Sequence, residues 1–335
     1  MTNADLLTRA RGGDDDAFRL LTDPYRRELL AHCYRMLGSV ADAQDALQET
    51  LLAAWQGLPG FGQRASVRTW LHRIATNRCL NALRTTRRRP IKAWDIPGVD
   101  PPSPTRTGET PWLGPFPDSM SAGVSGAPLG PESRYEQSES MSLAFVAALQ
   151  TLPPRQLAVL VLRDVLGFRA SEAADLLDTT VPSVNSSLTR ARRGLEHRRA
   201  QLGPAAVAAA VGSDVEARIA DRFVRAYESA DVEALVALFT DDIYLAMPPM
   251  PLEYEGREAA TLFFERLLVS GRRYSLIPTR ANGSLAFGSY VAGPDDVRYA
   301  TGLFAVTIVR GRLGAMTRFE QTELAAFGLP LTLPV

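Results

Sequence analysis

The 335-residue chain has no aspartate or glutamate between Thr50 and Trp94, although this stretch carries eight arginines and one lysine. The formal net charge of the whole chain is zero, so the excess of one sign is local. Repulsion among clustered cations destabilises a compact domain, and a polyanion is the usual partner that offsets it. Aromatic side chains such as Phe61 and Trp70 lie between the cations, which suits a surface that follows phosphates and stacks on bases.

Cysteine and long apolar runs are also scarce. Two cysteines, Cys33 and Cys79, are too few for a disulfide framework, and neither lies at a zinc-motif spacing from a histidine, so we expect no metal site. No run of 18 apolar residues is present to cross a membrane, and the N-terminus lacks the pattern of a signal peptide. The sequence therefore predicts a cytoplasmic protein with no membrane contact.

Length and charge divide the chain into segments. The chain is longer than one ordinary domain, and its 46% apolar residues can fill several cores. Residues 1–92 carry a net charge of +6, residues 93–140 of −5, residues 141–213 of +3 and residues 214–335 of −4. This alternation indicates two basic units, joined by an acidic linker and followed by an acidic block.

Apolar residues at helical spacing predict helices through most of residues 4–90. Gly38 separates the first long helix from one over 42–55, and a loop rich in glycine and proline over 58–63 precedes the last helix. That last helix ends in three consecutive arginines before Pro90, which cannot continue a helix.

Nine prolines over residues 91–135 predict an extended or disordered linker. Its segment 111–118 is too aromatic for a simple spacer, so we expect this segment to dock on a folded neighbour. Beyond the linker, residues 141–200 are again predicted to be helical.

The last third of the chain has a different pattern, in which β-rich runs follow one another without crossover helices. We expect helices over 215–229, 232–239 and 257–269, and strands near 242–247, 274–280, 284–292, 297–309 and 312–320. This order predicts an α+β cone and argues against a doubly wound sheet.

Residues 167–199 carry a second signal for DNA binding, a helix-turn-helix pattern. A short helix over 171–177 and a turn over 178–180 precede a longer helix with Pro182 in its first turn, where no N–H is needed. Apolar side chains of the longer helix recur at helical spacing and would face the core. Its opposite face carries polar groups that can reach phosphates and base edges. These are Ser183, Asn185, Ser186, Ser187, Thr189, Arg190 and Arg193. The alternative is a helical hairpin with a solvated basic face.

These blocks resemble the extracytoplasmic-function, or group IV, bacterial sigma factors. Residues 42–55 and 70–77 resemble region two of that family, and residues 152–192 resemble region four. The last third, with Met247-Pro-Pro-Met250, resembles a SnoaL-like cone of the nuclear-transport-factor type. The resemblance implies a multidomain protein. It would consist of all-α region two over 5–90, a linker over 91–138, all-α region four over 139–202 and an α+β cone over 214–330.

The resemblance implies a promoter-specificity subunit that directs core RNA polymerase to promoters and initiates transcription, without enzymatic activity or a cofactor. Its partners would be the β and β′ subunits of the polymerase core and promoter DNA, with a small apolar ligand and an anti-sigma protein as further candidates. Asp45, Gln48 and Glu49 would dock on the β′ subunit, because acidic and amide groups suit a basic partner.

The resemblance also assigns two sets of DNA-binding residues. The minus-ten element, as a single strand, would bind Phe61, Arg64, Arg68, Asn77, Arg84, Arg87 and Arg88. The minus-thirty-five element would bind Ser183, Asn185, Ser186, Arg190 and Arg193. A frequent Lys-Ser-Arg pattern of the family is replaced here by Asn185-Ser186-Ser187, which predicts weaker phosphate anchoring at that point.

All three histidines precede residue 200, which excludes a histidine acid–base mechanism in the cone. Two roles for the cone stay open. It could bind a small apolar ligand, or it could regulate the sigma regions by packing on them or on their linker. The ligand pocket would be lined by Tyr227, Phe239, Met247, Met250 and Phe319. For the whole chain, the alternatives are a one-component, ligand-sensing helix-turn-helix regulator and a cyclase-like enzyme.

Overall fold

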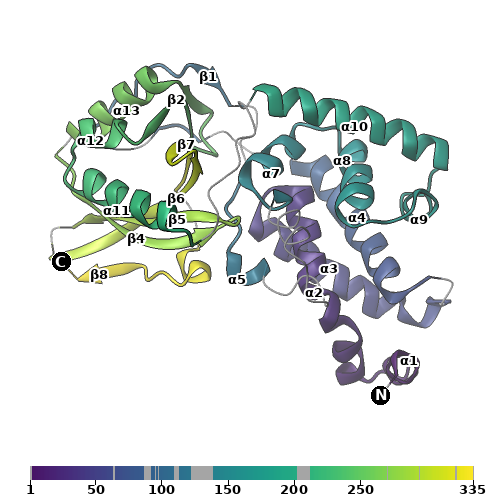
Figure 1. Cartoon of the computed structure of the whole chain (residues 1–335). Helices are drawn as coiled ribbons and strands as arrows, with labels where there is room; N and C mark the ends of the chain where they lie inside the picture. Colours follow the sequence, from purple (N-terminus) through teal and green to yellow (C-terminus); the bar gives the residue numbers. More distant parts are fainter. Residues whose placement is uncertain are drawn as a thin grey trace. The chain divides into compact units, whose positions relative to one another are not determined.

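The computed structural model describes most of the chain, which divides into two compact units (Figure 1). The described residues are 2–62, 65–86, 92–94, 96, 98–108, 113–121, 139–201, 212–269, 271–293, 295–320 and 323–334. The first unit contains residues 1–89, 120–141 and 145–198. The second contains residues 90–119, 142–144 and 199–335.

The first unit is helical throughout its described residues. Its N-terminal part contains α1 (Asn3–Arg11), α2 (Asp15–Leu37), α3 (Val40–Gly57), the short η1 (Leu58–Gly60) and α4 (Val67–Thr86). Its second part contains α7 (Leu143–Gln150), α8 (Pro154–Leu160), η2 (Val161–Val165), α9 (Ala170–Leu176) and α10 (Val181–Gln201). Asp14 and Ser39 cap α2 and α3, and Gly38 ends α2 with a φ of 72°, a conformation that favours glycine.

The core of the N-terminal part lies where α2, α3 and α4 pack together. Leu71, Ala75 and Cys79 are completely buried, and their spacing of four residues places them on one face of α4. Tyr34 of α2 is also completely buried. Arg73 and Arg84 of α4 are exposed away from this core, so the packing of the helix fixes which way they point.

The second unit is built on one mixed sheet. Its strands are β1 (Arg106–Thr107), β2 (Phe239–Ala246), β3 (Leu252–Glu255), β4 (Tyr274–Ala281), β5 (Ser284–Ala292), β6 (Val297–Val309), β7 (Arg312–Phe319) and β8 (Thr332–Pro334). The strand order is β1-β3-β2-β7-β6-β5-β4, and β8 pairs with β6. Only the β2–β7 pair is parallel among these described strands.

Helices α11 (Asp214–Glu228), α12 (Val232–Val236) and α13 (Arg257–Val269) lie on one side of this sheet (Figure 1). Side chains alternate between the two faces, so Leu285 and Phe287 of β5 join an apolar cluster with these helices. Ala286 joins a second cluster with Leu324 of the short η3 (Leu324–Phe327). The fold class predicted from the sequence, two all-α regions and an α+β cone, is confirmed; β1, β3 and β8 were not predicted.

The first part of the predicted linker packs against the sheet domain. Ile96 and Val99 are buried in the first apolar cluster, and the ring of Trp94 meets that of Phe263 edge to face. The Tyr254 hydroxyl donates to the Pro102 carbonyl oxygen (2.9 Å). Strand β1 then extends the sheet beside β3. We call residues 92–118, where described, the strap.

The end of the strap binds the β4–β5 hairpin. The Phe116 side chain is completely buried, and its N–H donates to Asn282 Oδ1 (2.8 Å), while the Asn282 N–H donates to the Phe116 carbonyl oxygen (2.9 Å). Asp118, in the short α5 (Asp118–Ser121), accepts from the Gly283 N–H (2.8 Å) and pairs with Arg280 (3.4 Å). The segment 111–118 was expected to dock, and its described residues 113–118 lie here; Pro111 and Trp112 lie outside the described residues.

Replacing the strap's buried phenylalanine tests this packing. Phe116→Ala should lower the free energy of unfolding of the sheet domain by about 3–5 kcal/mol, because a fully buried ring leaves a cavity. Leu331→Ala, at a side chain that is 69% exposed, should change it by less than about 0.5 kcal/mol. Urea-dependent hydrogen exchange of β4 and β5 measures both. Equal effects of the two substitutions would contradict the buried placement of Phe116.

Candidate polymerase and nucleic-acid interfaces

One face of α3 presents the predicted polymerase-binding residues to solvent. Asp45, Gln48 and Glu49 are all exposed, whereas Ala43, Ala46, Leu47 and Ala54 bury the opposite face. Leu52 shares the exposed face and is 58% exposed. It was not among the polymerase-binding residues predicted from the sequence.

Helix α4 presents its cations to acids from other segments. Arg68 Nε donates to both carboxylate oxygens of Glu28 on α2, at 2.9 and 3.1 Å. Arg73 pairs with Asp178 at 2.6 Å. Arg78 lies 3.8 Å from Glu49 on α3. Since α4 contains no acid of its own, each of these counter-charges comes from elsewhere in the chain.

The predicted minus-ten residues are not equally accessible. Asn77 and Arg84 are exposed on α4, and Arg84 donates to Asn81 Oδ1 (3.1 Å). Arg68 is only partly exposed, because it is held by Glu28. Phe61 is buried in a cluster with α1 and stacks on Trp70 with 4.5 Å between ring centroids.

The structure therefore does not present Phe61 as a free plane for a base. Apolar side chains of α1, which the sequence analysis did not assign to this loop, cover the ring. Arg64, Arg87 and Arg88 lie outside the described residues.

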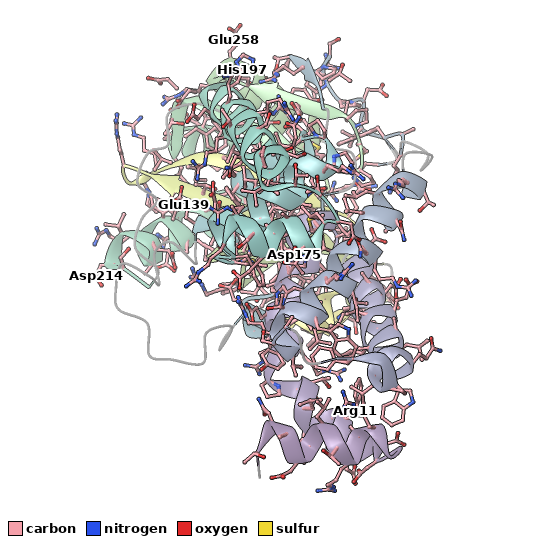
Figure 2. All side chains as sticks on the ribbon, turned by 90° about the vertical axis from the view of Figure 1, so that its right-hand side faces the viewer. Arg11, Glu139, Asp175, His197, Asp214 and Glu258 are labelled. Atoms are coloured by element: carbon pink, nitrogen blue, oxygen red, sulfur yellow. The ribbon has the colours of Figure 1, made fainter. Side chains whose placement is uncertain are left out.

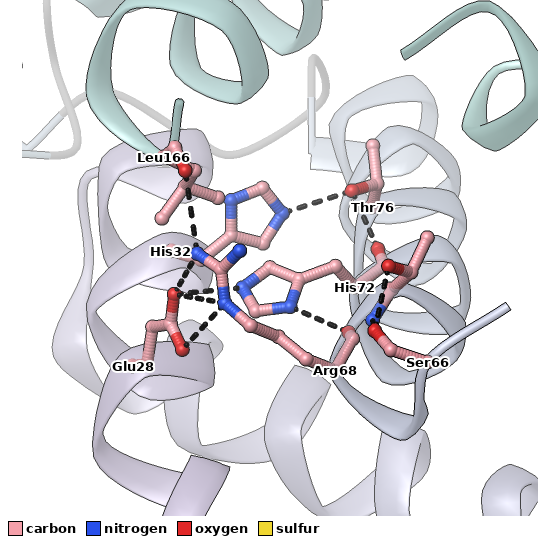
Figure 3. A network of polar contacts seen from close by, with 8 residues as sticks. Glu28, His32, Ser66, Arg68, His72, Thr76 and Leu166 are labelled. Carbon is pink, nitrogen blue, oxygen red and sulfur yellow. Dashed lines mark hydrogen bonds and ion pairs between the residues drawn. The ribbon is translucent and has the colours of Figure 1, made fainter. Parts of the chain in front are cut away.

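A buried polar network supports Arg68 (Figure 3). His72 Nδ1 donates to the Arg68 carbonyl oxygen (2.9 Å), and His72 Nε2 lies 3.8 Å from Glu28. The Thr76 hydroxyl donates to the His72 carbonyl oxygen (2.7 Å), so it accepts from His32 Nε2 (2.9 Å). These bonds place a proton on His72 Nδ1 and on His32 Nε2.

Burial lowers the pKa of both histidines below the ordinary value. For His32 the effect is large, and the neighbouring His72 and Arg35 add to it. For His72, burial outweighs the opposing influence of Glu28. Both rings are therefore neutral at pH 7, and their role is to position α2 against α4.

The helix-turn-helix is formed by α9 and α10, which a turn containing Asp178 connects. Val184, Leu188 and Ala191 bury one face of α10, and the predicted minus-thirty-five residues are exposed on the other. Those residues are Ser183, Asn185, Ser186, Arg190 and Arg193. Arg190 donates to the Ser186 hydroxyl (2.8 Å), so these two side chains support one another. Within the first unit, His197 on α10 and Arg11 on α1 lie at opposite ends (Figure 2).

The predicted ligand pocket is only partly assembled. Tyr227, Phe239, Met247 and Met250 are buried in one cluster, whereas Phe319 packs in the cluster on the other face of the sheet. A separate cavity of about 250 Å³ lies where the strap meets the loop after β2. Its lining residues are Lys92, Ala93, Trp94, Met250, Pro251 and Leu252.

No cluster of three or more His, Cys, Asp or Glu side chains that could hold a metal ion occurs within the described part of the chain. None of the helices in that same part is long and apolar enough to span a bilayer.

Comparison with known proteins identifies the three blocks. Residues 21–89 match the model of sigma-70 region 2, residues 142–195 match sigma-70 region 4, and residues 220–318 match the SnoaL-like domain. A crystal structure of the Mycobacterium tuberculosis extracytoplasmic-function sigma factor SigJ superposes with a TM-score of 0.55, over 91% of this chain and 97% of that chain. Its sequence identity is 22%, so it supports the fold alone.

Full-length relatives extend the match. The ECF RNA polymerase sigma factor SigG of Mycobacterium tuberculosis is 42% identical over 333 residues, covering 96% of this chain and 86% of SigG. SigW of Bacillus subtilis is 29% identical over 196 residues, covering 58% of this chain and 94% of SigW. The length of the SigW match corresponds to two sigma regions without a SnoaL-like domain.

The fold and its two helical DNA-binding regions define a transcription-initiation protein of the sigma-70 type with a SnoaL-like domain. More specifically, the chain belongs to the family of ECF RNA polymerase sigma factors. Its function is to bind core RNA polymerase and promoter DNA and to initiate transcription. Members of this family are not enzymes, and the ligand-sensing repressor and cyclase alternatives are not favoured.

The buried histidines predict an acid-dependent loss of stability. Their folded-state pKa values lie below that of the unfolded chain, so the unfolded state binds more protons as the pH falls below about 6.5. The unfolding free energy of the first unit should therefore decrease between pH 7 and pH 5, by at most about 1.4 kcal/mol per pH unit for each ring. Urea denaturation of the full chain at each pH measures this decrease.

His32→Gln keeps an N–H donor for Thr76 but cannot titrate, so it should flatten the pH dependence. Gln56→Ala, at an exposed site without a titratable group, should leave the pH dependence unchanged. If the unfolding free energy of the wild type is constant over this range, the two rings bind protons as readily in the folded state as in the unfolded state. That result would contradict the prediction.

Proposed function

We propose that this sigma factor docks on the β′ subunit of polymerase through the exposed face of α3, holds the single-stranded minus-ten element on α4 and reads the minus-thirty-five element with α10. The observation that carries the proposal is the exposure of complementary groups on α3 and α10, with Asn77 and Arg84 exposed on α4. Acids and an amide face solvent on α3, while hydroxyl, amide and guanidinium groups face solvent on α10. Since polymerase and promoters lie in the cytoplasm, we place the protein there.

Leu52 completes the proposed docking face. A protein interface draws most of its affinity from a few desolvated apolar or aromatic anchors, and charged groups around them set orientation and association rate. Leu52 provides the anchor, and Asp45 and Glu49 provide the charge toward a basic partner. Arg78 near Glu49 is a weak competitor, because both side chains are exposed and lie 3.8 Å apart.

The face of α10 combines base-reading and phosphate-binding groups. Asn185 near the N-terminus of the helix can read an adenine edge in the major groove. Arg190 and Arg193, one and two turns further on, suit phosphates. Ser186 supports Arg190, so its hydroxyl would act through that side chain.

The sheet domain would regulate initiation through the strap. The strap is held against the sheet at both Trp94 and Phe116. The residues between these two points therefore cannot also extend between the two promoter-binding regions. Only five residues, 87–91, separate the end of α4 from the strap, and five residues span at most about 18 Å. We therefore propose that the bound strap shortens the linker available between regions two and four to residues 87–91 and 119–138.

A small apolar ligand of the sheet domain would act at this strap. The cavity beside Trp94 and Met250 is lined almost entirely by apolar atoms, and its volume suits a molecule smaller than a typical drug. A ligand there would touch the strap and the sheet domain together, and so could alter how firmly the strap is held.

Charge reversal on α3 tests polymerase docking. The double variant Asp45→Arg with Glu49→Arg should weaken association with core polymerase at least about tenfold, because it opposes like charges across the interface. Run-off transcription on genomic fragments should be lost in parallel, while duplex binding by α10 is retained. Asp23→Arg, at an exposed acid on α2, is the matched control. Full association of the double variant would exclude α3 as the docking face.

Loosening the strap tests regulation by the sheet domain. Asn282 has a φ of 55°, so Asn282→Gly removes its bond to the Phe116 N–H without straining the backbone. Loss of one such bond should raise run-off transcription about twofold to fivefold. Asp296→Gly, at an exposed loop residue with a φ of 54°, should change nothing. Reduced or unchanged transcription with Asn282→Gly would contradict the proposed restraint.

A further inference from the structure

Region four contacts two arginines of α4: Arg68, a predicted minus-ten residue, and Arg73, which was not predicted. Arg68 Nη2 donates to the Leu166 carbonyl oxygen (3.3 Å), and the guanidinium carbon lies 4.8 Å from the centroid of the Phe168 ring. Arg73 Nη2 pairs with Asp178, which lies in the turn of the helix-turn-helix (2.6 Å). We call these contacts between α4 and residues 166–178 the latch.

The latch uses the same chemistry as single-stranded DNA. A nucleotide offers an anionic phosphate to one arginine and an aromatic base to another. Asp178 offers a carboxylate to Arg73, and Phe168 offers an aromatic plane to Arg68. Segment 166–178 therefore occupies α4 in the way that a phosphate and a neighbouring base would.

Further contacts hold the two regions together. Phe168 is buried, and its ring meets that of His72 edge to face. The latch is therefore in contact with the histidine network. At the far end of α2, Arg35 donates to the Ser140 carbonyl oxygen (3.1 Å), and Gln150 donates to the Arg35 carbonyl oxygen (3.0 Å). Separation of regions two and four would break both sets of contacts.

We propose that the single-stranded minus-ten element and segment 166–178 compete for α4, so that capture of the strand releases region four. This inference rests on the proposed binding of the minus-ten element by Arg68. Strand capture and domain opening are then one coupled equilibrium, and only the open fraction binds DNA. The apparent affinity for a single strand is accordingly lower than the intrinsic affinity of α4.

Two substitutions weaken the latch by different routes. Asp178 has a φ of 47°, a conformation that asparagine tolerates, so Asp178→Asn removes the charge and keeps the turn. Phe168→Ala removes the aromatic plane from Arg68 and His72. The matched control is Asp164→Asn, because Asp164 pairs with Arg192 inside region four.

The experiment measures distance and affinity in the full chain. Spin labels at Gln56→Cys on α3 and Asp175→Cys on α9 occupy exposed sites, while the native thiols Cys33 and Cys79 are buried and unreactive. Electron–electron resonance then reports the separation of the two regions. A single-stranded oligo-dT of twelve nucleotides is the probe, since stacking on arginine and aromatic planes tolerates any base.

The free chain should show one short distance, and saturating oligo-dT should lengthen it. Asp178→Asn should tighten oligo-dT binding about twofold to fivefold, as expected for an exposed ion pair, and Phe168→Ala should tighten it about tenfold. Asp164→Asn should match the wild type. Bound oligo-dT with an unchanged distance, or an unchanged affinity in Asp178→Asn, would overturn the competition.

A third variant separates this inference from the proposed function. Arg68→Gln in the Phe168→Ala background should weaken oligo-dT binding, because the aromatic latch contact of Arg68 is already absent there and the further loss is mainly that of DNA contact. If Arg68→Gln has no effect there, the proposed role of α4 in strand binding fails, and the competition fails with it. If it weakens binding while the Asp178→Asn and distance results are negative, only the competition fails.

Discussion

A basic helix without acids of its own must take its counter-charges from other segments, and the first unit is arranged around this constraint. The cations of α4 meet Glu28 of α2, Glu49 of α3 and Asp178 of the helix-turn-helix turn. These three acids belong to the core of region two, to the proposed polymerase-docking face and to region four. The acids that pair with α4 thus come from three different parts of the first unit.

The three pairs differ in strength, and the difference is functionally useful. Glu28 binds Arg68 through two oxygens in a partly buried setting, whereas the Arg73 and Arg78 pairs are exposed and contribute little to stability. Arg68 is therefore fixed in position, while Arg73 can exchange its protein carboxylate for a phosphate at small energetic cost. A weakly bound carboxylate of the protein can readily be replaced by a phosphate of DNA.

In the second unit, the predicted linker is part of the folded domain. Buried Ile96, Val99 and Phe116 supply apolar area to the sheet domain, and Asp118 joins Arg280 and Glu216 in an ion-pair group. A linker bound in this way gives the C-terminal domain a route to influence initiation without touching DNA. Regulation would then follow from how many residues are left to connect the two promoter-binding regions.

Much of the fold was predictable from residue patterns. Periodic apolar residues predicted α3, α4 and α10, and alternation predicted the long strands; the four-residue β3 is too short for such a signal. Phe319 lies three residues after Met316 on β7, so strand alternation alone places the two on opposite faces. The burial of Phe61 could not be predicted, because the covering side chains come from α1, some fifty residues away in sequence.

The acids that pair with α4 could not be predicted from the sequence either. Glu28 and Asp178 are separated from their arginines by 40 and 105 residues, and an acid in a helix or turn carries no mark of a distant partner. Leu52 could have been found, since a large apolar residue among the exposed positions of an amphipathic helix is a recognisable exception.

A cryo-electron microscopy structure of this chain with core polymerase and an opened promoter would test the account most directly. The account predicts that the Arg73–Asp178 pair is broken, that Phe168 has moved away from Arg68 and that both arginines contact the single strand. An intact Arg73–Asp178 pair beside bound minus-ten DNA would contradict it.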